Sequence, residues 1–392
     1  MKMQESEINE AFRAEVREWM GRHLQGRFAP LKHAAGLGSE GYDAALAKEW
    51  EQELARGGWT GLGWEVQYGG RHLPLAQQVI FHEEYVRCGG PGRIGHIGET
   101  LLAPTLMAYG TPEQKARFLP GILAGTDYWA QGYSEPGAGS DLAAIRTKAH
   151  RDEATGEWVI HGQKVWTSWA HESEWIFVLA RADEGGAPGA SKHAGMVLLL
   201  VLLKQAGVEI RPIRQITGTS EFNEVFFDGA RTEGSLHLGP VGDGWKVAMY
   251  LLGCERGAST LGQQAHFRHE LDQIIALARR NGAARDPLIR QRLAKADLGL
   301  QTLRSHALRS SADDTPARVA SVSKYAWSNW HRSLGELAMD VLGEQGELAL
   351  SDPDLRPLQQ LWLVSRADTI YAGTNEIQMN LMAERALGMP RG

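Results

Sequence analysis

Hydrophobic residues recur every three or four positions through the first part of the chain, the spacing that turns one face of a helix toward a core. The pattern predicts helices over residues 8–24, 42–56, 75–88 and 112–124. Glycines and aromatic residues are concentrated over 57–70, which predicts a loop there. The chain is therefore expected to begin with a helical domain, which we place at residues 1–127.

The pattern changes after about residue 128 to short runs rich in β-branched and aromatic residues. These runs predict strands over 157–160, 164–167, 175–180, 196–203, 208–210 and 224–227, with a turn at His161-Gly162. Gly, Ala, Pro and Ser dominate 183–193, which predicts an exposed hairpin loop. We expect a small antiparallel β-domain over residues 128–238.

Long helical stripes return after Trp245. One stripe contains Phe267, Leu271, Ile274 and Ala278, and the next contains Ile289, Leu293, Ala296, Leu300, Leu303 and Ala307. Stripes of this kind are typical of bundle cores rather than of ligand contacts. The predicted fold class is α+β and mainly α, with a helical bundle over residues 239–392.

Composition limits the possible partners. The chain has 392 residues, a hydrophobic share of 43% and a net charge of −6, so it can bury a large core and generates no field that favours a polyanion. The N-terminus lacks the apolar segment and cleavage site of a signal peptide, and the longest apolar run, 196–203, is far shorter than the roughly 20 residues that span a bilayer. We expect a cytoplasmic protein without nucleic acid or membrane partners.

Neither disulfides nor metals are expected. The two cysteines, Cys88 and Cys254, cannot form a disulfide framework, and the chain has no CxxC or HExxH spacing. His266 and His269 lie three residues apart on one predicted helix, but no acidic or thiolate neighbours accompany them. We predict no metal site.

The most informative local feature is the sequence YSEPGAGSD from Tyr133 to Asp141, together with Trp166-Thr167-Ser168 at the end of a predicted strand. Gly137 and Gly139 permit positive φ and close backbone approach, so this loop can direct N–H groups at an anion or a polar heterocycle. The same composition is common in ordinary turns. The loop alone therefore indicates either a cofactor site or a turn.

Six motifs together resemble the acyl-CoA dehydrogenase family, in family order and over nearly the whole chain. They are YSEPGAGSDLAAIRTKA, WVIHGQKVWTS, EFNEVFFD, GDGWKVAM, ERGASTLGQ and YAGTNEIQ. The resemblance implies an N-terminal helical domain, a central antiparallel β-barrel-like domain and a C-terminal four-helix bundle. It also implies FAD as cofactor and oxidation of an acyl-CoA thioester to trans-2-enoyl-CoA.

The resemblance assigns cofactor contacts to both segments of the glycine-rich feature. Ser134 matches the loop hydroxyl that bonds the pyrimidine side of the flavin, and Trp166 with Ser168 matches the strand that backs the isoalloxazine near N5. Serine replaces the family threonine at Ser134 and at Ser168, which keeps a hydroxyl but loses rotamer stiffness. Further contacts implied by the resemblance are Gln131, Tyr133, Gly139, Ser140, Thr167, Thr374 and Glu376.

The segment that resembles the family's site for the neighbouring subunit's FAD departs from the pattern. Asp340 stands where the family has glutamine, and Glu344 replaces the second glycine of a pair that begins at Gly343. Arg279 or Arg280 follows the first long bundle helix without the family's Phe-Gly pair. An arginine here can neutralise a pyrophosphate or cap the helix dipole, and both readings stay open.

The proton chemistry also departs from the best-known branch. Ala372 replaces the glutamate that removes the α-proton in short- and medium-chain enzymes. The resemblance to the isovaleryl and long-chain branches instead places the base at Glu255, directly before Arg256. A surface glutamate pairing along its helix is the alternative for Glu255. Glu376 and Glu135 match family residues without a proton-transfer role.

Other substrate contacts follow from the same resemblance. Ser140 matches a residue along the coenzyme A moiety, Ala372 and Gly373 match the segment whose backbone N–H bonds the thioester oxygen, and Arg256 is expected to order the thioester end or a helix contact. The alanine at 372 leaves room for a branched or bulky acyl chain, including sterol side-chain thioesters.

The resemblance implies an electron-transferring flavoprotein as partner and a homotetramer or homodimer, or a pair with a second, related subunit. Two rival functions remain at this stage. One is a flavin oxidase or monooxygenase of the same fold, and the other is a non-enzymatic family member acting as a scaffold or nucleic-acid binder.

Overall fold

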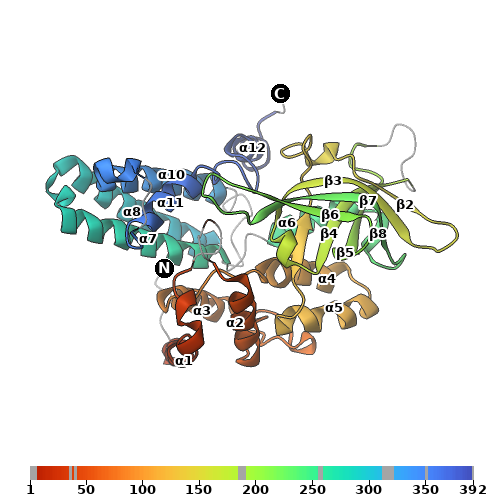
Figure 1. Cartoon of the computed structure of the whole chain (residues 1–392), viewed down its shortest axis with the longest axis horizontal. Helices are drawn as coiled ribbons and strands as arrows, with labels where there is room; N and C mark the ends of the chain where they lie inside the picture. Colours follow the sequence, from red (N-terminus) through yellow and green to blue (C-terminus); the bar gives the residue numbers. More distant parts are fainter. Residues whose placement is uncertain are drawn as a thin grey trace.

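The computed structural model describes residues 7–34, 38, 42–183, 191–254, 259–310, 322–348 and 352–390. Its elements form three groups, which Figure 1 shows as red and orange helices, a yellow and green sheet, and a cyan and blue bundle. The predicted fold class is therefore confirmed.

Helices that precede the sheet agree with the sequence pattern within a few residues. The four predicted helices are α1 (Glu7–His23), α2 (Ala44–Arg56), α3 (Leu75–Arg87) and α5 (Pro112–Ala124). Thr111 and Gln114 form a capping box at the start of α5, and Gly125 with φ 68° ends it. The sequence pattern missed the π-helix η3 (Ile97–Leu102) and α4 (Ala103–Tyr109), where Pro104 occupies the first turn and is tolerated there. Short 3-10 helices are η1 (Gly26–Leu31) and η2 (Val66–Tyr68).

Eight described strands form one sheet in the order β6-β7-β3-β2-β4-β5-β8, with β1 paired to β4. The strands are β1 (Trp129–Gly132), β2 (Lys148–Arg151), β3 (Trp158–Ser168), β4 (Trp175–Ala182), β5 (Met196–Leu202), β6 (Val208–Ile213), β7 (Phe222–Thr232) and β8 (His237–Gly242). The sheet is not purely antiparallel as predicted, because β1 and β2 each pair with β4 in parallel. The chain passes through β2 and β3 between β1 and β4, and through β3 between β2 and β4, so each parallel pair is joined by a crossover.

The predicted turn at His161-Gly162 is wrong. Strand β3 runs without interruption through both residues and pairs with β7, with a bulge beside His161. A Cβ on Gly162 would lie 2.5 Å from Thr147 Oγ1, so glycine is needed here for close packing between chain segments. The predicted hairpin loop at 183–193 lies mostly outside the described residues, which resume at Ser191.

Four long helices pack around one hydrophobic core and form the predicted bundle: α7 (Ser259–Asn281), α8 (Pro287–Ser310), α10 (Ser323–Leu342) and α11 (Arg356–Ser365). The stripe Phe267, Leu271, Ile274 and Ala278 is at most 3% exposed, which confirms its assignment to the core. Asn281 Nδ2 donates to Val341 O at 2.7 Å and joins the ends of α7 and α10. Shorter elements of this part are η6 (Ala283–Arg285), η7 (Gly343–Glu347), α12 (Asn375–Leu381) and the π-helix η8 (Met382–Ala386).

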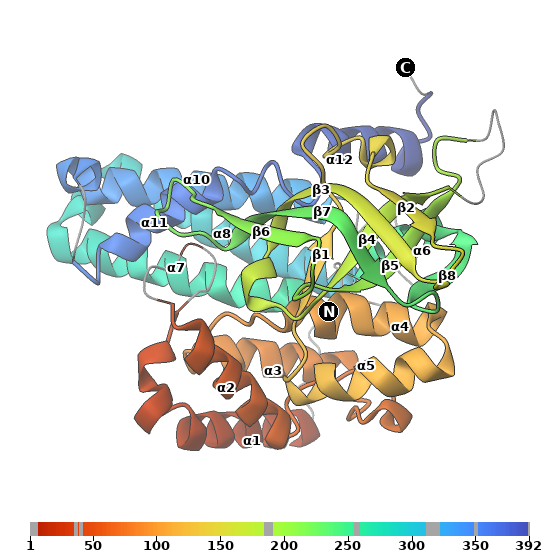
Figure 2. The ribbon, with the colours of Figure 1, turned by 45° about the vertical axis from the view of Figure 1, so that its right-hand side comes forward.

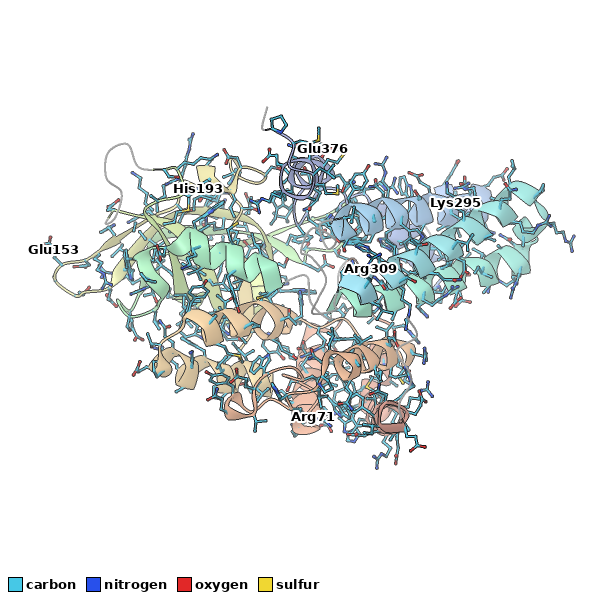
Figure 3. All side chains as sticks on the ribbon, turned by 180° about the vertical axis from the view of Figure 1, so that it is seen from behind. Arg71, Glu153, His193, Lys295, Arg309 and Glu376 are labelled. Carbon is cyan, nitrogen blue, oxygen red and sulfur yellow. The ribbon has the colours of Figure 1, made fainter. Side chains whose placement is uncertain are left out.

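Helix α6 (Gly244–Cys254) packs on the sheet rather than in the bundle. Its buried residues Val247, Ala248 and Leu251 share a core with Leu198 and Leu200 of β5. Figure 3, viewed from behind, shows α6 lying across the sheet next to α4. Because α7 follows soon after α6, the chain passes from the sheet to the bundle between Cys254 and Ser259.

None of the described helices is both long and apolar enough to span a membrane.

Candidate functional site

The glycine-rich loop after β1 lies against the end of β3. Val165 N donates to Ser134 O at 2.9 Å, which ties the loop to the strand. Glu135 and Ala138 exchange backbone hydrogen bonds of 3.1 and 3.0 Å and form a tight turn. A Cβ added at Gly137 or at Gly139 would meet nothing within 4 Å, so the outer side of this turn is open. The two sequence segments therefore form one surface.

A buried ion pair joins this loop to β3. Lys164 of β3 is fully buried, and its Nζ donates to Glu135 Oε1 at 2.8 Å and to Tyr133 O at 3.0 Å. The Glu135 carboxylate also accepts from the backbone N–H groups of Arg146 and Thr147. Burial lowers the pKa of Lys164 to about 8, against the attraction of the carboxylate. Burial opposes ionisation of Glu135 too, but Lys164 and the hydrogen bonds outweigh it and lower the pKa of Glu135.

Trp166 presents a large aromatic surface beside the open turn. Its backbone has φ 59° at an irregularity in the pairing of β3 with β7, and its side chain is 59% exposed. Thr167 is buried, and its hydroxyl has no hydrogen-bond partner among the described residues. Strand β3 alternates buried and exposed residues near its end, which leaves the Trp166 indole exposed and the Thr167 hydroxyl in the interior. The exposed indole fits the flat isoalloxazine that the resemblance implies.

Other residues predicted at the loop differ in their surroundings. The Tyr133 side chain is buried, with its ring 5.8 Å from that of Phe177, so it is a core residue. Gln131 and Ser134 are half-buried, and Gly139 and Ser140 are exposed. Next to Ser140, Asp141 Oδ1 accepts from Lys192 Nζ at 3.0 Å, which joins the loop to the described end of the β4–β5 connection.

The segment from Asp368 to Asn375 forms a closed loop between α11 and α12. Asn375 N donates to Thr369 O at 3.0 Å, and the Ala372 carbonyl accepts from Gln378 Nε2 at 3.3 Å. Ala372 has φ 50° and is exposed, and its own N–H donates to no group in the described part of the chain. A non-glycine residue rarely adopts positive φ. The N–H of this exposed, strained alanine is therefore left without a partner among the described residues, which fits the contact to a thioester oxygen that the resemblance implies.

Residues after Ala372 begin α12. Gly373 has φ 86°, and the Thr374 hydroxyl caps the helix by accepting from Ile377 N at 3.3 Å. Glu376 is exposed in the first turn, as Figure 3 shows. In both ribbon views α12 lies next to the sheet on the side of β3 (Figures 1 and 2). The structure thus places the helix that begins after Thr374 between the bundle and the sheet.

A buried histidine that the sequence pattern did not single out lies behind the Ala372 loop. His331 Nδ1 is 2.6 Å from Asp368 Oδ2, and His331 Nε2 is 2.8 Å from Glu270 Oε2. Burial would lower the pKa of His331, but the charge of Glu270 and the hydrogen bonds that the ring donates to both carboxylates raise it to about 10. The imidazole is therefore charged at neutral pH and donates to both. Residues distant in sequence make this cluster, so no local motif indicates it.

The charge of His331 predicts how stability changes with pH. Its pKa is raised from 6.5 to about 10 in the folded chain, so the folded chain holds an extra proton between these values. This stabilisation is full below pH 6.5 and is lost as the pH rises toward 10. We expect the free energy of unfolding of the wild type, measured relative to H331Q by urea denaturation, to fall by up to about 1.4 kcal/mol per pH unit between about pH 7 and 9. A difference that stays constant over this range contradicts the assignment.

Four predicted cofactor residues lie at the far end of the bundle. Arg279 is at the end of α7, and Asp340, Gly343 and Glu344 are at the end of α10 and in η7 (Figure 1). The structure therefore does not bring them to the glycine-rich loop of the same chain. Asp340 forms an ion pair with Arg292 of α8.

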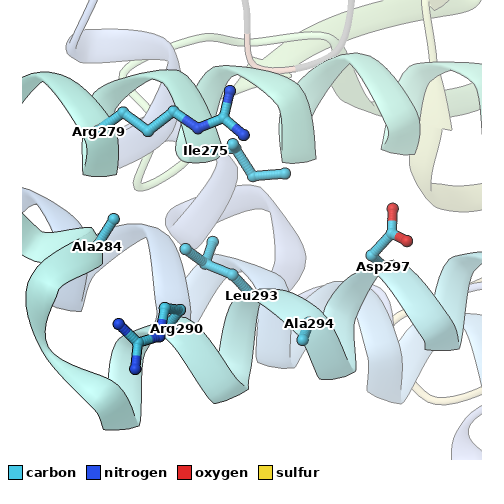
Figure 4. Close-up of a pocket in the computed structure, with 7 residues that line it drawn as sticks. All are labelled: Ile275, Arg279, Ala284, Arg290, Leu293, Ala294 and Asp297. Carbon is cyan, nitrogen blue, oxygen red and sulfur yellow. The ribbon is translucent and has the colours of Figure 1, made fainter.

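A pocket of about 310 Å³ opens between α7 and α8 near this end. Arg279, Arg290 and Asp297 are its charged lining residues, and Figure 4 shows them with Ile275, Ala284, Leu293 and Ala294. Arg280 Nη1 lies 3.7 Å from Asp354 Oδ2, outside this lining. Of the two arginines considered from sequence, Arg279 is the one placed in a concave site.

Glu255 and Arg256 lie outside the described residues, between the end of α6 at Cys254 and the start of α7 at Ser259. Among the residues that are described, no group of three or more His, Cys, Asp or Glu side chains is arranged to hold a metal ion. His269 instead stacks on His33, with ring centroids 4.5 Å apart.

Comparison with known proteins gives concordant matches along the chain. Residues 6–126, 130–230 and 242–387 match the family models for the N-terminal, middle and C-terminal domains of acyl-CoA dehydrogenases. The chain is 54% identical to the acyl-CoA dehydrogenase IpdE1 of Mycobacterium tuberculosis, over 97% of this chain and 98% of that protein.

Two solved structures are also similar over the full length of both chains. The Tcur3481–Tcur3483 steroid ACAD superposes with a TM-score of 0.86 at 30% identity, and covers 100% of each chain. The ChsE4–ChsE5 complex from M. tuberculosis gives a TM-score of 0.84 at 27% identity, again with 100% coverage of each chain.

Proposed function

Because the chain belongs to the acyl-CoA dehydrogenase family of oxidoreductases, we propose that it binds FAD and dehydrogenates an acyl-CoA thioester between its α and β carbons. The observation that carries the FAD assignment is the Trp166 indole, 59% exposed beside the open glycine turn. FAD bound there would supply the two-electron acceptor for the hydrogen that leaves the β-carbon. All other steps depend on residues of this chain.

The proposed flavin contacts come from two parts of the chain: the glycine-rich loop with the end of β3, and the start of α12. Trp166 would back the ring system, and the hydroxyls of the half-buried Ser134 and Ser168 would offer hydrogen bonds to its polar edge, whereas the Thr167 hydroxyl is buried away from it. Thr374 and Glu376 approach from the start of α12. The buried Lys164–Glu135 pair fixes the loop that carries Ser134, since it joins the loop to β3 at a position without solvent.

Two groups act on the substrate itself. The Ala372 N–H donates to the thioester oxygen, which stabilises the negative charge that develops when the α-proton leaves. The Glu255 carboxylate takes that proton and becomes a carboxylic acid, while a double bond forms between the α and β carbons. Two electrons and the β-hydrogen leave together, so the products are a trans-2-enoyl-CoA and the reduced cofactor. A carboxylate that enters a dry pocket beside a flavin would have its pKa raised by desolvation, toward the range a general base needs.

We also propose that the far end of the bundle serves a neighbouring subunit. The guanidinium of Arg279, in the pocket between α7 and α8, can donate two hydrogen bonds to the pyrophosphate of that subunit's FAD. Gly343 and Glu344 would lie near the adenosine part. Asp340 is paired to Arg292 and is therefore less suited to bind the adenosine. The altered segment favours assembly with a second, related subunit over a conventional homotetramer, and the similar ChsE4–ChsE5 structure is a complex. An electron-transferring flavoprotein is the proposed acceptor.

The proposed substrate class is a thioester with a bulky acyl group, including a steroid side chain. Two observations support this choice. The alanine at 372 leaves no carboxylate on the loop assigned to the substrate carbonyl, and the structure that superposes with a TM-score of 0.86 is a steroid ACAD.

An anaerobic titration of the flavin-loaded protein with a panel of acyl-CoA thioesters tests the proposal. The panel contains straight-chain, branched and steroid side-chain thioesters. We expect bleaching of the flavin absorbance by at least the bulky members, slow reoxidation by air and fast reoxidation by an electron-transferring flavoprotein. A colourless protein that takes up no FAD, or a flavin that no thioester bleaches, contradicts the proposal. Rapid reoxidation by air supports an oxidase instead.

The contribution of Trp166 to FAD affinity can be measured by mutation. W166A is expected to weaken FAD binding by roughly 10-fold, since it removes an aromatic contact worth about 0.5–1.5 kcal/mol beyond its buried area. W166F keeps a smaller ring and is expected to lose less. The dissociation constant comes from fluorescence titration of the apoprotein with FAD. Equal affinities for wild type and W166A place the flavin elsewhere.

A further inference from the structure

We propose that His331 is a positioning residue for the reaction: as an imidazolium bound between Glu270 and Asp368, it fixes the loop that presents the Ala372 N–H to the thioester oxygen. The inference rests on the proposed function, because Ala372 is assigned there. It adds a residue that the family resemblance does not assign and that lies in the core of the bundle.

The first step of the argument is that α10 holds the loop at both ends. On the upstream side, His331 bonds the Asp368 side chain, and Lys324 Nζ donates to the Asp368 carbonyl. On the downstream side, Ser328 Oγ donates to Asn375 Oδ1 at 2.9 Å, and Asn375 Nδ2 donates to Asn329 Oδ1 at 3.2 Å. One rigid helix therefore sets the positions of both Asp368 and Asn375.

The second step is that Asp368 transmits this hold to the residue before Ala372. Tyr371 OH donates to Asp368 Oδ1 at 2.7 Å, while Asp368 Oδ2 faces His331 Nδ1 at 2.6 Å. Burial, and then the Asp368 charge, raises the pKa of Tyr371, so its hydroxyl remains a donor. Asp368 is 2% exposed. A buried carboxylate is costly without partners, and the Asp368 side chain finds them in His331 Nδ1 and Tyr371 OH.

The third step concerns the strain at Ala372. An alanine with φ 50° is disfavoured by about 1 kcal/mol relative to ordinary conformations. Such a conformation persists only where the surrounding structure determines it. Tyr371 is anchored before Ala372 and Asn375 after it, so the loop cannot relax while both anchors hold. If the upstream anchor is lost, the Ala372 peptide is free to rotate.

The fourth step connects the loop to the helix that follows the proposed base. Glu270 lies on α7, which begins at Ser259, next to the segment 255–258 that contains Glu255. His331 Nε2 bonds Glu270 at 2.8 Å. His331 therefore ties the loop that presents the Ala372 N–H to the helix that follows Glu255, through one side chain with 6% exposure. A shift of about 1 Å between the Ala372 N–H and the proposed base is enough to slow catalysis by up to about 100-fold.

The test compares H331Q with H306Q. The glutamine side chain in H331Q keeps a hydrogen-bonding amide but carries no positive charge. The control changes another bundle histidine, which bonds Ser323 Oγ at 3.0 Å and does not touch the Ala372 loop. The readout that a merely structural role does not move is the red shift of a bound aromatic enoyl-CoA, such as 4-(dimethylamino)cinnamoyl-CoA, because this shift reports polarisation of the thioester carbonyl. Flavin reduction at saturating and half-saturating acyl-CoA is measured in parallel.

We expect H331Q to bind the chromophore with nearly unchanged affinity but with a clearly smaller red shift, and to reduce its flavin roughly 10- to 100-fold more slowly at saturating substrate. H306Q is expected to match the wild type in both. A flavin-loaded H331Q with the full red shift and the full rate overturns the inference, even when its melting temperature is lower. If H331Q does not fold, E270Q is compared with H306Q instead, because Glu270 is the more exposed partner of the His331–Glu270 pair. A wild type that reduces its flavin with acyl-CoA but gives no red shift also overturns the inference, whereas a wild type without flavin reduction refutes the proposed function itself.

Discussion

E255Q is expected to retain FAD and to lower the rate of flavin reduction by acyl-CoA by about 10²- to 10⁴-fold, the usual contribution of a general base. The reason is chemical: glutamine has nearly the same shape as glutamate but cannot accept the α-proton. Stopped-flow absorbance under anaerobic conditions gives the rate. Because Ala372 cannot act as a base, no second carboxylate at that position rescues the variant.

Two further variants make this prediction specific. E209Q changes an exposed glutamate of β6 that pairs with Arg211, and it is expected to leave the rate unchanged. E376Q is expected to affect retention of FAD rather than the rate within the flavin-loaded fraction. If E255Q reduces its flavin as fast as the wild type while E376Q does not, the base is Glu376 and our assignment is wrong.

K164M is expected to destabilise the protein by about 3–5 kcal/mol, because it leaves the Glu135 carboxylate buried without its cation. The same change frees the glycine-rich loop from β3, so we also expect FAD to be lost on gel filtration. Urea denaturation and the flavin-to-protein absorbance ratio measure the two effects.

The double variant E135Q/K164M separates charge from packing. It removes both charges and keeps one amide oxygen, which can accept from the N–H group of Arg146 or of Thr147. We expect it to recover most of the stability lost in K164M, since removal of a buried pair is far less costly than removal of one partner. A K164M protein as stable and as yellow as the wild type shows that the pair does not hold the loop.

Much of the fold could be predicted because its signals are local. The spacing of Phe267, Leu271 and Ile274 is enough to indicate a buried helix face, and the structure places all three in the bundle core. Thr111 and Pro112 likewise mark the start of α5. Such features depend on neighbours within one or two turns of chain, which a sequence pattern contains.

The parts that were missed depend on contacts between distant residues. Strands β1, β2 and β8 have only four to six residues each and take their place from partners elsewhere in the sheet. Gly162 was read as a turn because its close contact with Thr147 cannot be seen along the chain. His331 meets partners 37 and 61 residues away.

The candidate site shows the same division. The glycine-rich loop and Trp166 were predicted from the motif, and the structure brings them together. The buried Lys164 and the cluster of His331, Asp368 and Glu270 were not predicted. To predict them, one would need to know which side chains the fold buries next to one another. The residues that hold these loops in place therefore became visible only in the structure.

An anaerobic single turnover with an α-deuterated acyl-CoA tests the central claim most directly. Three quantities are measured in the same sample: flavin reduced, enoyl-CoA formed and α-deuterium lost from the substrate. The account predicts equal amounts of all three in the wild type and none of them in E255Q on the same time scale. Flavin reduction without enoyl-CoA, or full enoyl-CoA formation by E255Q at the wild-type rate, contradicts it.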